Sequence, residues 1–203
     1  MTAGRGKARS TRSVRDVKSP SLADIAKVKA RICSEPTSAY LELYSIRCTD
    51  ALRVYRVIEA AFAGVALGTG VGLQEAQGLD DYADAATCAA YRAKDEKDDW
   101  HRIAPEALNQ CYSSLSFFDA PGMRFHLPAY LLADLRGDYH FGMAFGLTRL
   151  SDYSAKQFAL LSCEQRAAVR AFLLHIADDP NYRSEHPHIV RALEEYWTES
   201  SSS

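Results

Sequence analysis

The chain has 203 residues, of which 47% are hydrophobic and 25% charged, and its formal net charge is −2. This composition provides enough apolar surface for a compact domain and excludes wholesale disorder. No apolar run approaches the ~18 residues of a membrane span, and five scattered cysteines without a C-x-x-C pair disfavour a disulfide framework or a structural zinc site. We therefore expect a cytoplasmic protein that makes no membrane contact and needs no cofactor.

The charge is unevenly distributed along the chain. Residues 1–20 contain six Lys or Arg and one Asp, so this arm carries +5 and the remainder carries −7. A basic arm can bind nucleic acid, but it can equally be a solvated tail or the result of a misplaced start codon. We expect a disordered basic arm (1–20), a single helical domain (21–198) and a disordered tail (199–203), and we expect nucleic-acid contact only through the arm.

Taken in chain order, the apolar spacing predicts a mainly α-helical domain of about seven helices. Helix breaks are expected at Pro36 and Gly78, and helix starts at Thr49, Pro105 and Ser162. The expected helical segments, several of them short, span residues 22–32, 50–63, 73–78, 80–93, 95–103, 105–113, 129–136, 155–161, 163–176 and a last one from Pro187. Residues 65–73 are glycine-rich and read as a connection between helices.

Residues 116–131 differ from the helical pattern around them. The sequence at Ala120, Pro121 and Gly122 is typical of a turn, and residues 123–127 alternate as in a short strand. We therefore expect a short extended, hairpin-like element near residues 117–127, followed by a helix that begins at Pro128 and ends at Gly137.

Common catalytic motifs are missing from the sequence. The glycines at 68, 70 and 72 are followed by Leu-Gln-Glu rather than Gly-Lys-Ser/Thr, so they do not form a phosphate-binding loop. Neither G-x-S-x-G nor H-E-x-x-H occurs. The histidines at 186 and 188, beside Glu185, are expected to be exposed, and pairing of Cys111 with His126 as nucleophile and base has no local support.

Eight carboxylates lie between residues 75 and 99. Three readings are open: a hard-metal or acid–base site, an acidic surface for a basic partner, or helix caps and a solvated face. The carboxylates are Glu75, Asp80, Asp81, Asp84, Asp95, Glu96, Asp98 and Asp99. Nearby, Arg124 is expected to pair either with Asp119 across the predicted turn or with one of these carboxylates. His126 is expected to be a core or rim residue.

These residues also carry a resemblance. Leu73-x-Glu75-Ala76, Asp80-x-Tyr82, Asp95-Glu96 with Trp100, and above all the Arg-Phe-x-Leu-Pro-Ala-Tyr motif of residues 124–130 resemble an uncharacterised bacterial family of unknown function. The resemblance covers roughly residues 60–174. It implies a small, mainly helical cytoplasmic protein and transfers no catalytic role.

The leading hypothesis is a protein-binding or regulatory protein, with immunity proteins as one example, that binds a basic partner. The alternative is an enzyme, with or without a divalent cation, whose acidic site is built from the carboxylates of residues 75–99 together with Arg124 and His126. The candidate functional surface comprises Glu75, Asp80, Asp81, Asp95, Glu96, Trp100, Arg124 and His126. The oligomeric state and the partner are not predicted.

Overall fold

The computed structural model describes residues 35–198, with side chains from residue 45 onward. Within this range the chain forms nine α-helices and three short 3₁₀ helices and contains no strand, which confirms the mainly helical class. The α-helices are α2 (Glu35–Ala61), α3 (Leu73–Asp80), α4 (Ala85–Lys94), α5 (Pro105–Gln110), α6 (Ala120–Leu135), α7 (Ala144–Thr148), α8 (Asp152–Gln157), α9 (Cys163–Ala177) and α10 (His186–Glu195). The 3₁₀ helices are η1 (Trp100–Arg102), η2 (Ser114–Ser116) and η3 (Pro180–Tyr182).

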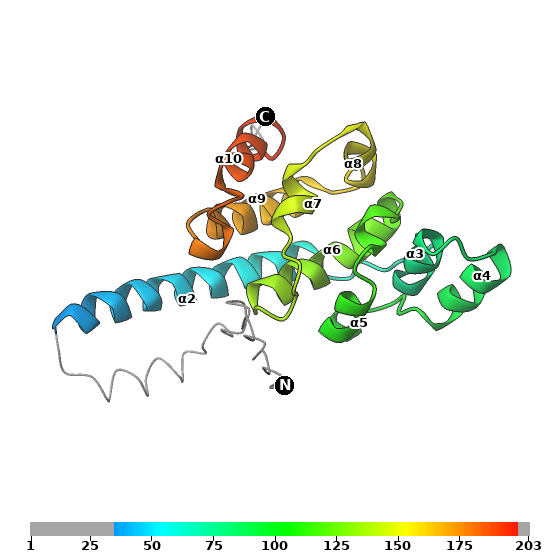
Figure 1. Cartoon of the computed structure of the whole chain (residues 1–203), viewed down its shortest axis with the longest axis horizontal. Coiled ribbons are helices and arrows are strands. Elements are labelled where there is room, and N and C mark those ends of the chain that lie inside the picture. Colours follow the sequence, from blue (N-terminus) through cyan, green and yellow to red (C-terminus); the bar gives the residue numbers. More distant parts are fainter. Residues whose placement is uncertain (1–34, 199–203) are drawn as a thin grey trace, which may run out of the picture.

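The long helix α2 organises the fold (Figure 1). Helices α6 and α9 both pack against it, α10 packs on α9 and α7, and α8 packs on α6. Helices α3 and α4 pack on each other and form one end of the molecule, beyond the C-terminus of α2. One core runs through these helices, with Phe62, Tyr130, Phe172 and Trp197 among its largest fully buried side chains.

Helix α2 is continuous through the positions where a break and a new start were predicted. Pro36 is the second residue of α2 and lies in the first turn, where its missing N–H removes no helical hydrogen bond. The Thr49 hydroxyl donates to the carbonyl of Ser45 at 2.8 Å instead of capping a helix. The predicted break at Pro36 and cap at Thr49 are therefore wrong, while the helix expected at residues 22–32, the basic arm and the tail lie outside the described residues.

The extended element predicted near residues 117–127 is also wrong, because most of this block belongs to α6. The carboxylate of Asp119 accepts from the N–H of Gly122 at 2.8 Å and caps the helix, so Ala120-Pro121-Gly122 is a first helical turn. Pro128 lies inside α6 and leaves the carbonyl of Arg124 without its helical partner. The buried residues on both sides of Pro128, such as Phe125 and Tyr130, compensate for that loss by core packing.

Two more boundaries differ from the prediction. Gly78 lies within α3 rather than between helices, and the break falls at residues 81–84. The helix predicted at residues 95–103 is reduced to η1, because the Glu96 carboxylate accepts from the N–H groups of Lys97, Asp98 and Asp99 and closes a turn there. By contrast, Pro105 opens α5, Ser162 and Gln165 form the predicted capping box of α9, and Pro187 lies in the first turn of α10.

Candidate functional site

The glycine-rich loop of residues 65–72 is held by one arginine of α4. The guanidinium of Arg92 donates to the carbonyl of Gly70, to the carbonyl of Gly68 at 2.8 Å, and to the carboxylate of Glu75 at 3.1 Å. The Glu75 carboxylate also accepts from the N–H of Gly72 at 2.9 Å, at the start of α3. Arg92 and Glu75 therefore fix the glycine-rich loop, which connects α2 to α3, against the helices α3 and α4 rather than face a ligand.

Asp95 caps α3 from a distance of twenty residues in sequence. Its carboxylate accepts from the N–H groups of Gln74 at 2.8 Å and Glu75 at 3.2 Å, where the N-cap residue, Gly72, has no side chain to do so. Only 8% of Asp95 is exposed, and this burial raises its pKa above the usual value. A side chain at Gly72 would collide with the Asp95 carboxylate, so the glycine is required for this arrangement.

The same loop also packs against the start of α6. The Asp119 carboxylate accepts from the N–H of Val71 at 2.9 Å as well as from Gly122, and a Cβ at Gly122 would lie 2.6 Å from the carbonyl of Val71. Asp119 thus joins α6 to the loop and does not pair with Arg124. This close contact of backbones requires glycine at position 122.

Glu96 and Trp100 also have structural roles. The three backbone hydrogen bonds that the Glu96 carboxylate accepts lower its pKa. The indole N–H of Trp100 donates to the carbonyl of Phe62 at 3.0 Å, and the ring is buried beneath His101, with centroids 3.6 Å apart. Trp100 therefore joins η1 to the end of α2.

Arg124 and His126 do not reach the carboxylates, contrary to the arrangement considered for an enzyme. Arg124 makes no hydrogen bond or ion pair with any residue in the described range, and its Nε is buried without a partner. His126 is fully buried, stacks on Phe118 with centroids 4.3 Å apart, and its Nδ1 lies 2.7 Å from the carbonyl of Gly122. Burial lowers its pKa to about 4, so the ring is neutral at pH 7 and Nδ1 carries the donated proton.

Three of the remaining carboxylates lie at the turn between α3 and α4, whereas Asp99 caps η1 and lies 2.7 Å from Nδ1 of His101. Asp80 is the last residue of α3, Asp81 follows it and is exposed, and Asp84 caps α4 by accepting from the N–H of Thr87 at 2.7 Å. That hydrogen bond lowers the pKa of the exposed Asp84 carboxyl. Asp81 and Asp84 are exposed and Asp80 is half-buried, whereas Glu75 and Asp95 bind groups inside the fold.

Tyr82 stands in the middle of this turn. It is 96% exposed and has φ +55°, the only positive φ of a non-glycine among residues 35–198. Its N–H donates to the carbonyl of Leu79 and the next N–H, that of Ala83, to the carbonyl of Gly78, which is the pattern of a helix end whose left-handed position usually holds glycine. Neither packing nor backbone preference explains a tyrosine at this position.

Tyr82 and Arg92 were not among the residues predicted for the candidate surface. A helix assigned to residues 80–93 placed Tyr82 on a helix face, and no local pattern shows that Arg92 reaches back to a loop more than twenty residues earlier. Among the described residues no group of three or more His, Cys, Asp or Glu is arranged to hold a metal. No helix within this range is both long and apolar enough to cross a membrane.

The comparisons with known proteins identify a family but not an activity. No curated protein and no solved structure is significantly similar to this chain. A family model described as a family of unknown function, DUF6714, matches residues 50–201, which is about three quarters of the chain and includes the whole segment with the expected resemblance. The chain therefore belongs to the DUF6714 family.

Proposed function

We propose that this protein binds a basic protein partner through the turn between α3 and α4. The observation that carries the proposal is Tyr82, an aromatic side chain that is almost fully exposed at a backbone position suited to glycine. A non-glycine residue in this conformation costs on the order of 1 kcal/mol. Residues that are unfavourable for the fold in this way are concentrated at functional sites.

The charges around Tyr82 favour a cationic partner. Asp81 and Asp84 lie on either side of it in sequence and are exposed, and Asp80 is half-buried beside them. An Arg or Lys side chain placed over the tyrosine ring gains about 0.5–2 kcal/mol from the cation–π interaction. The carboxylates add electrostatic steering that speeds association and selects basic surfaces.

The internal carboxylates support this surface. Because Glu75, Asp95 and Arg92 join α3, α4 and the glycine-rich loop through hydrogen bonds, the turn is presented by a fixed pair of helices. A partner that binds a fixed turn loses less conformational entropy than one that must order it. In this proposal the protein binds its basic partner in the bacterial cytoplasm, either as a regulator or as an immunity protein that neutralises a basic toxin.

Affinity capture from a lysate of the organism that encodes the chain tests this proposal. The immobilised wild-type chain is compared with Tyr82→Ala and with Leu174→Ala, a control that removes an exposed apolar side chain from α9. We expect a basic protein to be retained by wild type and by Leu174→Ala, to be lost from Tyr82→Ala, and to elute as salt is raised. Equal recovery from all three chains would contradict the proposed site.

A further inference from the structure

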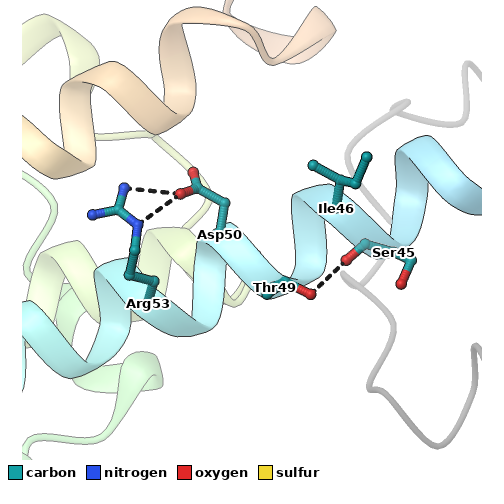
Figure 2. Close-up of a pocket in the computed structure, with 5 residues that line it drawn as sticks. All are labelled: Ser45, Ile46, Thr49, Asp50 and Arg53. Carbon is teal, nitrogen blue, oxygen red and sulfur yellow. Dashed lines mark hydrogen bonds and ion pairs between the residues drawn. The ribbon is translucent and has the colours of Figure 1, made fainter.

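A second surface, on the outer side of α2, is independent of the α3–α4 turn. Ile46 is 60% exposed there and shares a helix face with Thr49 and Arg53, which follow it at i+3 and i+7 (Figure 2). Together with Ser45 and Asp50 these residues line a shallow hollow of about 340 Å³. An exposed isoleucine in a hollow is a contact surface that lacks an apolar partner.

The neighbouring face of α2 is already occupied. Arg47 pairs with Asp179 at 2.9 Å, Asp50 lies 2.7 Å from Nδ1 of His175, and Val54 is fully buried, so this row of α2 packs on α9 and the segment that follows it. The face with Ile46 lies next to this seam. Ile46 is left 60% exposed by residues 45–198, so this face is open to a side chain from outside that range or from another molecule.

We propose that residues 22–32 form an amphipathic helix that packs antiparallel on this face of α2. The segment carries Leu22, Ile25 and Ile32 at helical spacing, and only two residues separate it from Glu35, where α2 begins. A helical hairpin with a turn of that length returns the chain directly along α2. Leu22 and Ile46 are both about twelve residues from the turn, which is about 18 Å of helix, and so lie at the same height.

The same geometry explains why this occupant is favoured over a second copy or another protein. An isolated helix of about eleven residues is marginal in water and requires a partner surface for its apolar side. The hollow beside Ile46 is such a surface, and it lies at the position along α2 that residues 22–25 would reach after a two-residue turn. Leu22 and Ile25 provide aliphatic side chains that would fill it. The basic residues 1–20 then leave the fold beside Asp50, at mid-length of α2.

Hydrogen exchange of the full chain measures this docking directly. In wild type we expect the amides of residues 22–32 to be protected at every protein concentration. Ile46→Asp should lower that protection about tenfold or more, because it removes the burial of an aliphatic side chain. Leu52→Asp makes the same change at a partly exposed position on another face of α2 and should leave residues 22–32 protected. Protection of α9 reports that each variant is folded, and Ile46→Ala gives a milder second test.

Three results would overturn the proposal. Exchange of residues 22–32 at the rate of an unstructured chain in wild type would show that no such helix docks. Protection that is unchanged in both Ile46 variants would place the helix elsewhere. Protection that rises with concentration, together with a doubled mass in solution, would assign the face to a second copy of the chain.

Discussion

A methyl group added at Gly72 would collide with the carboxylate that caps α3. Gly72 has φ −77° and ψ 171°, which alanine adopts without strain, so only contacts oppose the substitution. The three atoms nearest to a Cβ at this position all belong to Asp95, namely Oδ2, Cγ at 2.7 Å and Cβ at 2.9 Å. Gly72→Ala should therefore displace Asp95 and remove the acceptor of the Gln74 and Glu75 amides.

The expected cost follows from those two hydrogen bonds. Loss of an N-cap costs about 1 kcal/mol, and a buried amide without an acceptor costs about 1–3 kcal/mol. Gly72→Ala should thus lower the free energy of unfolding by about 2 kcal/mol. In an Asp95→Gly background all three colliding atoms are absent, and alanine should stabilise the protein by about 0.4–1 kcal/mol because it restricts the unfolded chain. The sign of the effect is expected to reverse.

Urea denaturation of wild type, both single variants and the double variant, followed by circular dichroism at pH 7, measures this cycle. The expected coupling energy between positions 72 and 95 is about 2–3 kcal/mol, the sum of the loss that is avoided and the gain from alanine. If Gly72→Ala were equally destabilising in both backgrounds, Gly72 would be required for a reason other than the Asp95 cap, and the account of this site would be refuted.

Three further predictions concern residues of the same region. Because burial lowers the pKa of His126 from 6.5 to about 4, the unfolded chain binds this proton first, so the stability linked to neutral His126 is present above pH 6.5 and is lost as pH falls toward 4. Between pH 7.5 and 5 the free energy of unfolding of wild type, measured in urea, should fall by about 2 kcal/mol more than that of His126→Phe, and parallel pH curves would contradict this. Arg92→Met should lower the free energy of unfolding by about 2 kcal/mol and speed hydrogen exchange in residues 68–75. Arg92→Lys should be destabilised as well, because a single ammonium group lacks the forked geometry that binds two carbonyls and a carboxylate, and unchanged exchange in both variants would contradict the role of Arg92. Trp100→Phe should lower the free energy of unfolding by about 1 kcal/mol because the carbonyl of Phe62 loses the indole N–H and keeps the N–H of Val65 as a donor, and an unchanged urea midpoint would contradict this.

Several helix ends could be predicted because their signals are local. Ser162 and Gln165 bond to each other's backbone within one turn, and Pro105 needs no partner to begin α5. Gly64 has the left-handed φ of +70° expected after the end of α2. In each case the residues that determine the boundary are close neighbours in sequence, so a pattern of a few letters contains the necessary information.

Other features depend on contacts between distant residues. Pro128 was predicted to begin a helix, because proline is favoured at the first helical position. Instead α6 continues through Pro128, because residues on both sides of it are buried in the core. Asp95 was recognised as a candidate, but its role depends on Gln74 and Glu75, more than nineteen residues away. The acidic segment therefore combined two sets of carboxylates, internal caps and exposed groups, that the sequence alone could not separate.

The affinity of the captured basic partner for Tyr82→Gly, measured together with the stability of that variant, tests whether Tyr82 binds the partner. Glycine suits the left-handed position, so the free energy of unfolding should be unchanged or higher by up to about 1 kcal/mol. The dissociation constant should nevertheless rise about tenfold, since a desolvated cation–π contact of up to about 2 kcal/mol is lost, while Tyr82→Phe retains most of the affinity. An unchanged dissociation constant would contradict a binding role of Tyr82, and a marked loss of stability in Tyr82→Gly would show that the residue serves the fold.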